Sequence, residues 1–167
     1  MSLLPLQPSD RYSVMEWRNE QLDILRQVEP LTESDQDKYF ENVVARWYRE
    51  IKPEGVLFGI HCDSSLIGYG GLVHIDWDHR NAEVSFLLAD ADCQSSDYVD
   101  LFTRFLQLIQ AVARTLKLKK VFCVGYDQKR YRFSAFNALG FKREAILRNH
   151  VRVQDRLCNV LIHSQQI

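Results

Sequence analysis

The chain has 167 residues, of which 46% are hydrophobic, and its formal net charge is −1. This length supports one well-filled core and is short for two. The near-neutral charge and a pI of about 6.5 predict no binding to nucleic acid or to an anionic membrane surface. No apolar run approaches the roughly 20 residues that span a bilayer, and the first residues lack the basic flank of a signal peptide.

The cysteines are spaced too irregularly for a structural zinc site. Cys62, Cys93, Cys123 and Cys158 form no CxxC pair, which favours a reducing compartment and predicts a core thiol at Cys123. We therefore expect a single α/β domain over residues 1–167 in the cytoplasm.

The first third of the chain predicts a lead-in and two helices. Residues 5–12 are predicted as an edge strand or lead-in, and a short helix runs from Val14 toward Leu25. Thr32 and Asp35 have the spacing of a capping box. They open a helix that reaches about Tyr48, because apolar residues recur there at helical spacing.

Three strands are predicted next, at residues 56–61, 66–74 and 82–88, with turns short enough for an antiparallel meander. Gly68, Gly70 and Gly71 lie inside the second of them. Glycine weakens strand pairing, so these residues predict either a bulge or the close approach of another backbone or a ligand.

Residues 82–124 predict a crossover connection. An apolar run at 84–88 is followed by a polar loop at 89–97, an amphipathic helix at about 98–117 and a strand at 121–124. The loop leads from the carboxyl end of a strand to a helix N-terminus, where free N–H groups and the helix dipole favour an anion. We expect a phosphorylated ligand to bind there.

The chain ends in a basic stretch at 128–132, a short helix at 133–139 and two strands at 146–153 and 157–163. Gly140 follows the short helix at the position of a C′ cap.

This order of elements, together with four motifs, resembles the GCN5-related N-acetyltransferase (GNAT) superfamily and most of all its RimJ/RimL-like branch. The segment Glu16-Trp17-Arg18-Asn19 is similar to the early helix of that branch. Residues 66–72 resemble its "IG-x-x-GL" segment, residues 82–88 its fourth strand, and residues 139–148 its "LGF-x-x-E-G-x-L-R" close. The resemblance implies a mixed, mostly antiparallel central sheet with helices on both faces, in which the fourth and fifth strands splay apart.

The resemblance also implies acetyl-CoA as the cosubstrate, without a metal. The pantetheine arm would lie along Phe86, Leu87 and Leu88. The pyrophosphate loop would consist of Gln94, Ser95, Ser96, Asp97, Tyr98 and Val99. Lys129 and Arg130 would contact the CoA phosphates, although a solvated charge run explains them as well. Asp97 and Val99 depart from the family, which has small residues at these positions.

Acetyl transfer to an amine requires a base, donors for the thioester carbonyl and, in some enzymes, an acid. Glu83 is the first candidate base, because related enzymes keep a carboxylate at the start of this strand; the alternative is a strand-end residue in a surface ion pair. His74 and His79 are further candidates. The family's usual acid, a tyrosine, is replaced by Phe136, and Tyr131 is a weak substitute.

Two functions follow from these observations. The first is an N-acetyltransferase acting on a small-molecule or peptide amine, either an amino sugar or a protein N-terminus, and the Trp17-Arg18-Asn19 segment favours the sugar. Trp17, Trp47 and Trp77 then line the acceptor pocket or, alternatively, pack in the core. The second is a non-catalytic binding or assembly module, favoured by Phe136 and the altered loop. Both functions are compatible with a homodimer.

Overall fold

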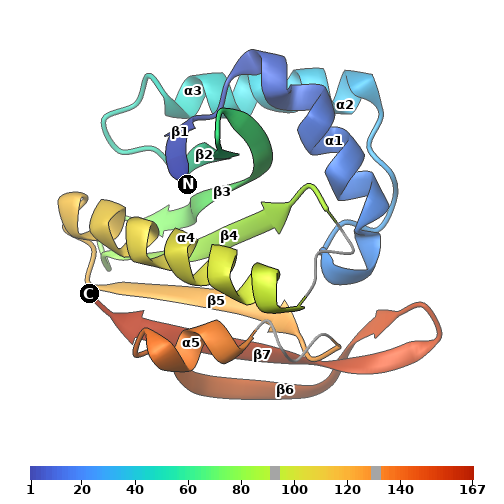
Figure 1. Cartoon of the computed structure of the whole chain (residues 1–167), viewed down its shortest axis with the longest axis vertical. Coiled ribbons are helices and arrows are strands. Elements are labelled where there is room, and N and C mark those ends of the chain that lie inside the picture. Colours follow the sequence, from blue (N-terminus) through green and yellow to red (C-terminus); the bar gives the residue numbers. More distant parts are fainter. Residues whose placement is uncertain (91–94, 129–132) are drawn as a thin grey trace. The chain divides into compact units, whose positions relative to one another are not determined.

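A computed structural model describes residues 1–90, 95–128 and 133–167 (Figure 1). The chain divides into an N-terminal unit (residues 1–75 and 85–92) and a C-terminal unit (residues 76–84 and 93–167). Its strands form a seven-stranded sheet in the order β1-β2-β3-β4-β5-β7-β6. The predicted mixed α/β class is therefore confirmed, whereas the single domain remains a prediction.

The N-terminal unit contains three strands, the end of a fourth, and short helices. The elements are β1 (Ser2–Pro5), η1 (Pro8–Asp10), α1 (Arg11–Glu20), η2 (Leu22–Ile24), α2 (Glu33–Tyr39), the π-helical segment η3 (Phe40–Val44), α3 (Ala45–Trp47), β2 (Val56–Cys62), β3 (Ser65–Asp76) and the end of β4 (Asn81–Leu88). β1 pairs with β2, and β2 with β3, in antiparallel fashion.

Two helices in this unit begin where a side chain accepts a hydrogen bond from a main-chain N–H. The predicted capping box is confirmed, because the Asp35 N–H donates to Thr32 Oγ1 at 3.2 Å. Of the two alternatives predicted for residues 5–12, an edge strand or a lead-in, the edge strand is wrong: β1 ends at Pro5 and α1 begins at Arg11. Asp10 accepts a hydrogen bond from the Gln7 N–H at 2.8 Å, so a helical turn forms ahead of α1.

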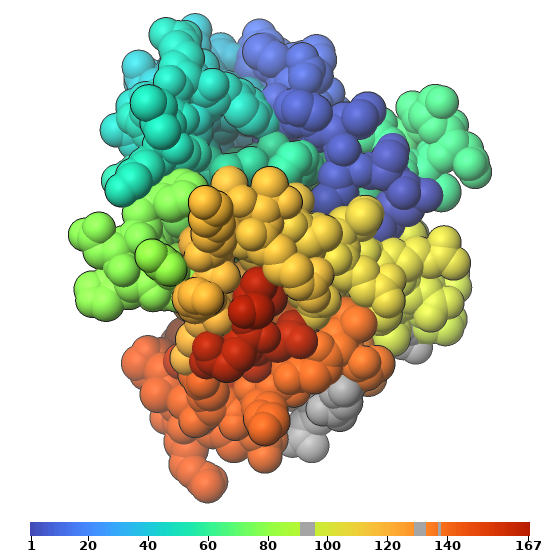
Figure 2. All heavy atoms as spheres, turned by 90° about the vertical axis from the view of Figure 1, so that its left-hand side faces the viewer, coloured from blue at the N-terminus to red at the C-terminus, as the bar shows by residue number. Residues whose placement is uncertain are grey.

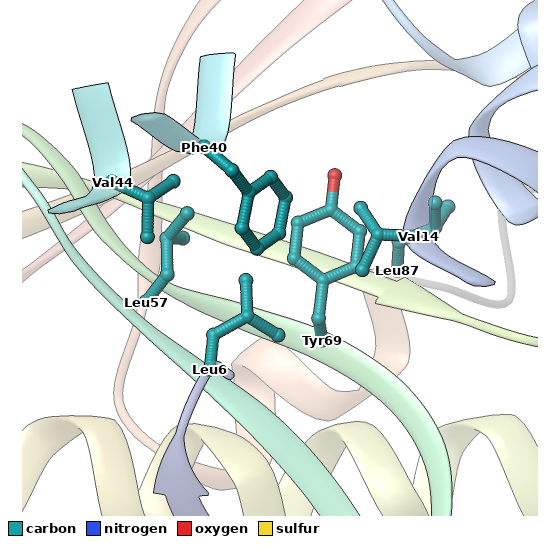
Figure 3. Packing of buried hydrophobic residues seen from close by; sticks show 7 residues of the cluster. All are labelled: Leu6, Val14, Phe40, Val44, Leu57, Tyr69 and Leu87. Carbon is teal, nitrogen blue, oxygen red and sulfur yellow. The ribbon is translucent and has the colours of Figure 1, made fainter. Parts of the chain in front are cut away.

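The core of the N-terminal unit joins its helices to its strands. Figure 3 shows side chains from the residue after β1 and from α1, the π-helical segment, β2, β3 and β4 meeting in one cluster: Leu6, Val14, Phe40, Val44, Leu57, Tyr69 and Leu87. Each of these residues is at most 5% exposed. Burial of this cluster holds the helical layer on the strands.

The glycines of β3 serve both of the purposes predicted for them. Ile60 pairs with Gly68 while His61 pairs with Leu66, so Ile67 is the extra residue of a bulge. A β-carbon at Gly68 would lie 2.5 Å from the Leu87 carbonyl oxygen. One at Gly71 would lie 1.9 Å from the Val56 carbonyl oxygen. Only glycine permits these backbone approaches.

The C-terminal unit contains the start of β4 and the remaining elements: α4 (Ser95–Thr115), β5 (Lys120–Tyr126), α5 (Ser134–Ala138), β6 (Lys142–Val153) and β7 (Arg156–Gln166). β4 pairs in parallel with β5 from Asn81 to Glu83, which confirms the predicted crossover. β7 lies antiparallel between β5 and β6. The Ile167 N–H donates to the Lys119 carbonyl at 2.9 Å, and Figure 2 shows this red chain end at the surface of the unit.

Helix α4 begins at Ser95, three residues before the predicted start. Asp97 lies in its first turn, where a carboxylate stabilises the helix dipole, so part of the predicted loop is helical. Phe105, Leu106 and Ile109 form its fully buried stripe.

Gly140, which follows α5, has a φ of +80°, as expected of a C′ cap. In the parts of the chain given above, no helix is long and apolar enough to cross a membrane.

We expect Gly71→Ala to destabilise the protein by about 3 kcal/mol, because the new methyl group meets a main-chain oxygen that cannot rotate away. Gly59→Ala is the matched control, since its β-carbon meets side-chain atoms that can move, Leu66 Cδ1 at 2.7 Å and His61 Nε2 at 3.1 Å. Urea denaturation of both variants gives the comparison. Equal stabilities would show that β2 and β3 do not approach as closely as described.

Candidate functional site

The carboxyl end of β4 is fixed by hydrogen bonds within the N-terminal unit. Gln21, at the end of α1 and only 3% exposed, donates its Nε2 to the Leu88 carbonyl at 2.7 Å. The Ala89 N–H donates to the Ile67 carbonyl at 2.9 Å. Leu87 and Leu88 are each 3% exposed as whole residues. The main chain of this strand end is therefore covered together with its side chains, and the Leu88 carbonyl accepts a hydrogen bond.

A polar network lies one helical turn before Gln21. Arg18 donates its Nη1 to the Tyr69 hydroxyl and its Nε to Gln27 Oε1, both at 2.9 Å. Tyr39 is influenced by the same residues. Burial raises the pKa of its hydroxyl to about 12, and Tyr69 contributes to a lesser extent. The positive charge of Arg18 lowers the pKa of Tyr39 and so opposes this shift. The network thus combines one cation with neutral hydroxyl and amide groups.

Glu83 lies in the C-terminal unit, in the last recorded pair of β4 with β5. Its side chain is buried, with 9% exposed, so the alternative of a surface residue is wrong. Burial raises the pKa of the Cys123 thiol well above its usual value, and the nearby Glu83 raises it further. Cys123 is therefore a core thiol, as predicted, and Glu83 is a carboxylate shielded from water.

The two candidate histidines are more exposed than Glu83. His79 lies in the turn after β3, where its Nδ1 is 2.9 Å from Asp76 Oδ2 and its N–H donates to Asp76 Oδ1 at 2.8 Å. These bonds lower the pKa of the Asp76 carboxyl. His74 is exposed on β3 with a φ of +51°. His79 thus stabilises the turn through its bonds to Asp76, and this role is separate from any part in catalysis.

The start of α4 presents main-chain groups to a ligand. Ser96 and Asp97 are exposed in its first turn, whereas the Tyr98 ring is buried against Phe102 with ring centres 5.8 Å apart. Val99 is half-buried. The N–H groups of a first turn have no partner inside the helix, so they suit a phosphate. Gln94, Lys129, Arg130 and Tyr131, and the side chain of Ser95, lie outside the described residues.

Phe136, at the position where the sequence resemblance predicts a tyrosine that acts as the acid, lies in an aromatic cluster. It is 2% exposed, and its ring centre is 4.8 Å from that of His163 and 5.1 Å from that of Phe141. His163 also lines a hollow of about 340 Å³ together with Arg143 and Asp127. Phe136 therefore serves packing and offers no proton.

Sequence reasoning missed His163. It is 7% exposed, and its Nδ1 has no hydrogen-bond partner among the residues with a described position. Burial lowers the pKa of its imidazole, and the charge of Arg143 lowers it further. The only signal in the sequence was a histidine directly after the apolar run Val160-Leu161-Ile162, which also suits an ordinary strand.

These features were compared with known proteins. The family model for the acetyltransferase (GNAT) domain matches residues 5–162. The chain belongs to this family. The GNAT membership predicted from the sequence motifs is therefore confirmed. No curated protein sequence matches the chain.

Solved structures agree with the GNAT fold. Spermidine N-acetyltransferase from Vibrio cholerae, in complex with CoA and spermine, has a TM-score of 0.82 at 16% identity, covering 99% of this chain and 94% of that one. A probable acetyltransferase has a TM-score of 0.76 at 20% identity, covering 98% and 91%. At such identities the likeness establishes the fold alone.

We expect His163 to make stability depend on pH in weakly acidic solution. Its native pKa is lowered, so the unfolded chain binds more protons as pH falls below about 6.5, and native stability falls with it. The Tm of the wild type should be lower at pH 5.5 than at pH 7.5, and this difference should be smaller in His163→Phe. His150→Gln, at an exposed position, should keep the wild-type drop. An unchanged drop in His163→Phe would contradict this assignment.

Proposed function

We propose that this GNAT-family chain is an acetyl-CoA-dependent N-acetyltransferase that acetylates a primary amine on an amino sugar or a protein N-terminus. The observation that carries the proposal is the match to the acetyltransferase family over residues 5–162. The structurally similar Vibrio cholerae enzyme, whose complex holds CoA and spermine, supports an amine as the acceptor. The RimJ/RimL-like branch, the homodimer and the cytoplasmic location remain predictions.

The residues present suit acetyl-CoA mainly through their main chain. In the proposal, the strand backbone at Phe86, Leu87 and Leu88 pairs with the pantetheine arm, and the first-turn N–H groups of α4 receive the pyrophosphate. Exposed Asp97 adds a negative charge close to these N–H groups. Two like charges at contact distance repel by about 1 kcal/mol even in water, so the phosphates are expected to bind the backbone and to avoid this carboxylate.

Glu83 is the proposed general base. A buried carboxylate can accept the proton of the acceptor ammonium in surroundings from which water is largely excluded. The neutral amine then attacks the thioester carbonyl and CoA leaves as its thiol. Phe136 has no proton to give, so Tyr131 or water is the proposed donor to the departing sulfur. His74 and His79 remain alternative bases, since an imidazole nitrogen is a common general base.

One observation favours the second hypothesis, a non-catalytic module with the same fold. Phe136 is buried in a cluster with Phe141 and His163, so the family's acid position serves packing here. A module of this kind would not turn over acetyl-CoA and would need neither the cofactor nor Glu83. The enzyme would need both.

We expect acetyl-CoA at about 100 times its Kd to stabilise the protein by about 2.7 kcal/mol, because the ligand binds only the native state. Thermal unfolding with and without acetyl-CoA measures this shift. ADP at the same concentration controls for a general effect of phosphate anions. No shift at millimolar acetyl-CoA would favour the binding module.

We expect Glu83→Gln to lower kcat/KM about 100-fold or more, because the amide keeps the shape of the side chain and cannot accept the proton. Release of the CoA thiol with an amine acceptor measures the rate. Glu144→Gln is the matched control, since Glu144 is exposed and pairs with Lys120 at 2.7 Å. If kcat/KM of Glu83→Gln is unchanged across pH, Glu83 has no part in the mechanism.

A further inference from the structure

Arg18 is a half-buried cation whose hydrogen-bond partners in the described part of the chain are neutral. Its hydrogen bonds go to the Tyr69 hydroxyl and to Gln27 Oε1. Among residues 1–90, 95–128 and 133–167, no carboxylate lies at ion-pair distance from Arg18. A guanidinium has five N–H donors, so most of these donors have no acceptor within those ranges.

The Arg18 charge is partly removed from water. Removing a cation from water is costly unless an anion and hydrogen bonds replace the water. Arg11 on the same helix has both: its Nε lies 2.6 Å from Asp37 Oδ1. Among the residues with a described position, Arg18 has no such carboxylate, while Tyr69 and Gln27 hold its side chain in one direction. Its remaining donors are therefore open to an anion or to water.

The guanidinium is tied to the part of the N-terminal unit that holds the end of β4. Gln21 lies three residues after Arg18, which places the two side chains on one side of the chain turn, and it donates to the Leu88 carbonyl at 2.7 Å. Tyr69, which accepts from Arg18, packs in the same cluster as Leu87 (Figure 3). Arg18 is therefore linked through Tyr69 to the cluster that contains Leu87, one of the residues at which the pantetheine arm is proposed to lie.

We propose that Arg18 binds an anionic group on the acceptor, so that the substrate is an amine carrying a phosphate or a carboxylate. The inference rests on the proposed acetyltransferase function and narrows its acceptor. A guanidinium suits both groups, because its planar N–H fork can bind two oxygens at once. A polyamine is disfavoured, since its further ammonium groups would meet a cation that no carboxylate of the described residues neutralises.

The same contacts have a purely structural explanation. Gln27 also donates to Asn19 Oδ1 at 3.0 Å, and Asn19 accepts from the Leu31 N–H at 2.7 Å. Arg18 would then only fasten the segment after α1 to β3. The two explanations differ in acceptor specificity, because a structural arginine affects all acceptors alike.

The test compares acceptors that differ by one charged group. Glucosamine is paired with glucosamine 6-phosphate, which adds a phosphate, and with muramic acid, which adds a carboxylate; spermidine represents the polyamines. We expect kcat/KM to be at least tenfold higher for one of the two anionic sugars than for glucosamine and for spermidine. The anionic sugar that is preferred identifies the recognised group as a phosphate or a carboxylate.

Arg18→Gln should reduce that anionic preference about tenfold to hundredfold, as expected for the loss of a charged hydrogen bond. Arg18→Lys keeps the charge and should retain part of the preference, which guards against a folding defect in Arg18→Gln. Arg49→Gln removes an exposed arginine from the same unit and should keep the wild-type preference.

Three results would overturn the inference. Preference for spermidine, or an equal loss for every acceptor in Arg18→Gln, would assign Arg18 a structural role while leaving acetyl transfer itself intact. If the wild type binds no acetyl-CoA and acetylates no amine, the proposed function fails, and the inference fails with it.

Discussion

The contact on which the N-terminal part of the site depends is the approach of the β3 main chain to the end of β4. A β-carbon at Gly68 would lie 2.5 Å from the Leu87 carbonyl oxygen, so no other residue type fits without moving one of the two strands. Gln21 secures the next residue by donating to the Leu88 carbonyl. The strand end at which we propose acetyl-CoA binds is thus fixed by main-chain packing and one buried amide, before any cofactor is present.

Charge, more than shape, distinguishes the chemistry proposed for this chain. The fold resembles that of a spermidine N-acetyltransferase at 16% identity, and one fold can serve many acceptors because specificity lies in particular side chains. Here, Arg18 has neutral hydrogen-bond partners in the described part of the chain, and Glu83 is buried. Our proposals assign the first to an anionic group of the acceptor and the second to its ammonium proton.

Much of the architecture could be predicted because it is encoded locally. The Thr32 capping box, the Gly140 cap and the crossover from β4 to β5 each depend on residues close together in sequence. The early starts of α1 and α4 were missed, because Asp10 and Asp97 resemble loop residues until their helix is known. The π-helical turn at Phe40–Val44 was missed as well, since its apolar spacing is that of an ordinary helix.

By itself, the sequence determined the order of the elements, the GNAT resemblance and the residue types available for catalysis, because periodicity, caps and motifs are short-range properties. The tertiary structure decided which of those side chains are shielded from water and which lack a partner. Glu83 is buried although strand-end glutamates are commonly exposed, and His163 has no partner for its Nδ1 in the described part of the chain. The acceptors that Arg18 finds among the same residues are neutral. Burial and pairing depend on residues that are distant in sequence, as the Arg18–Tyr69 contact shows, so no local pattern could reveal them.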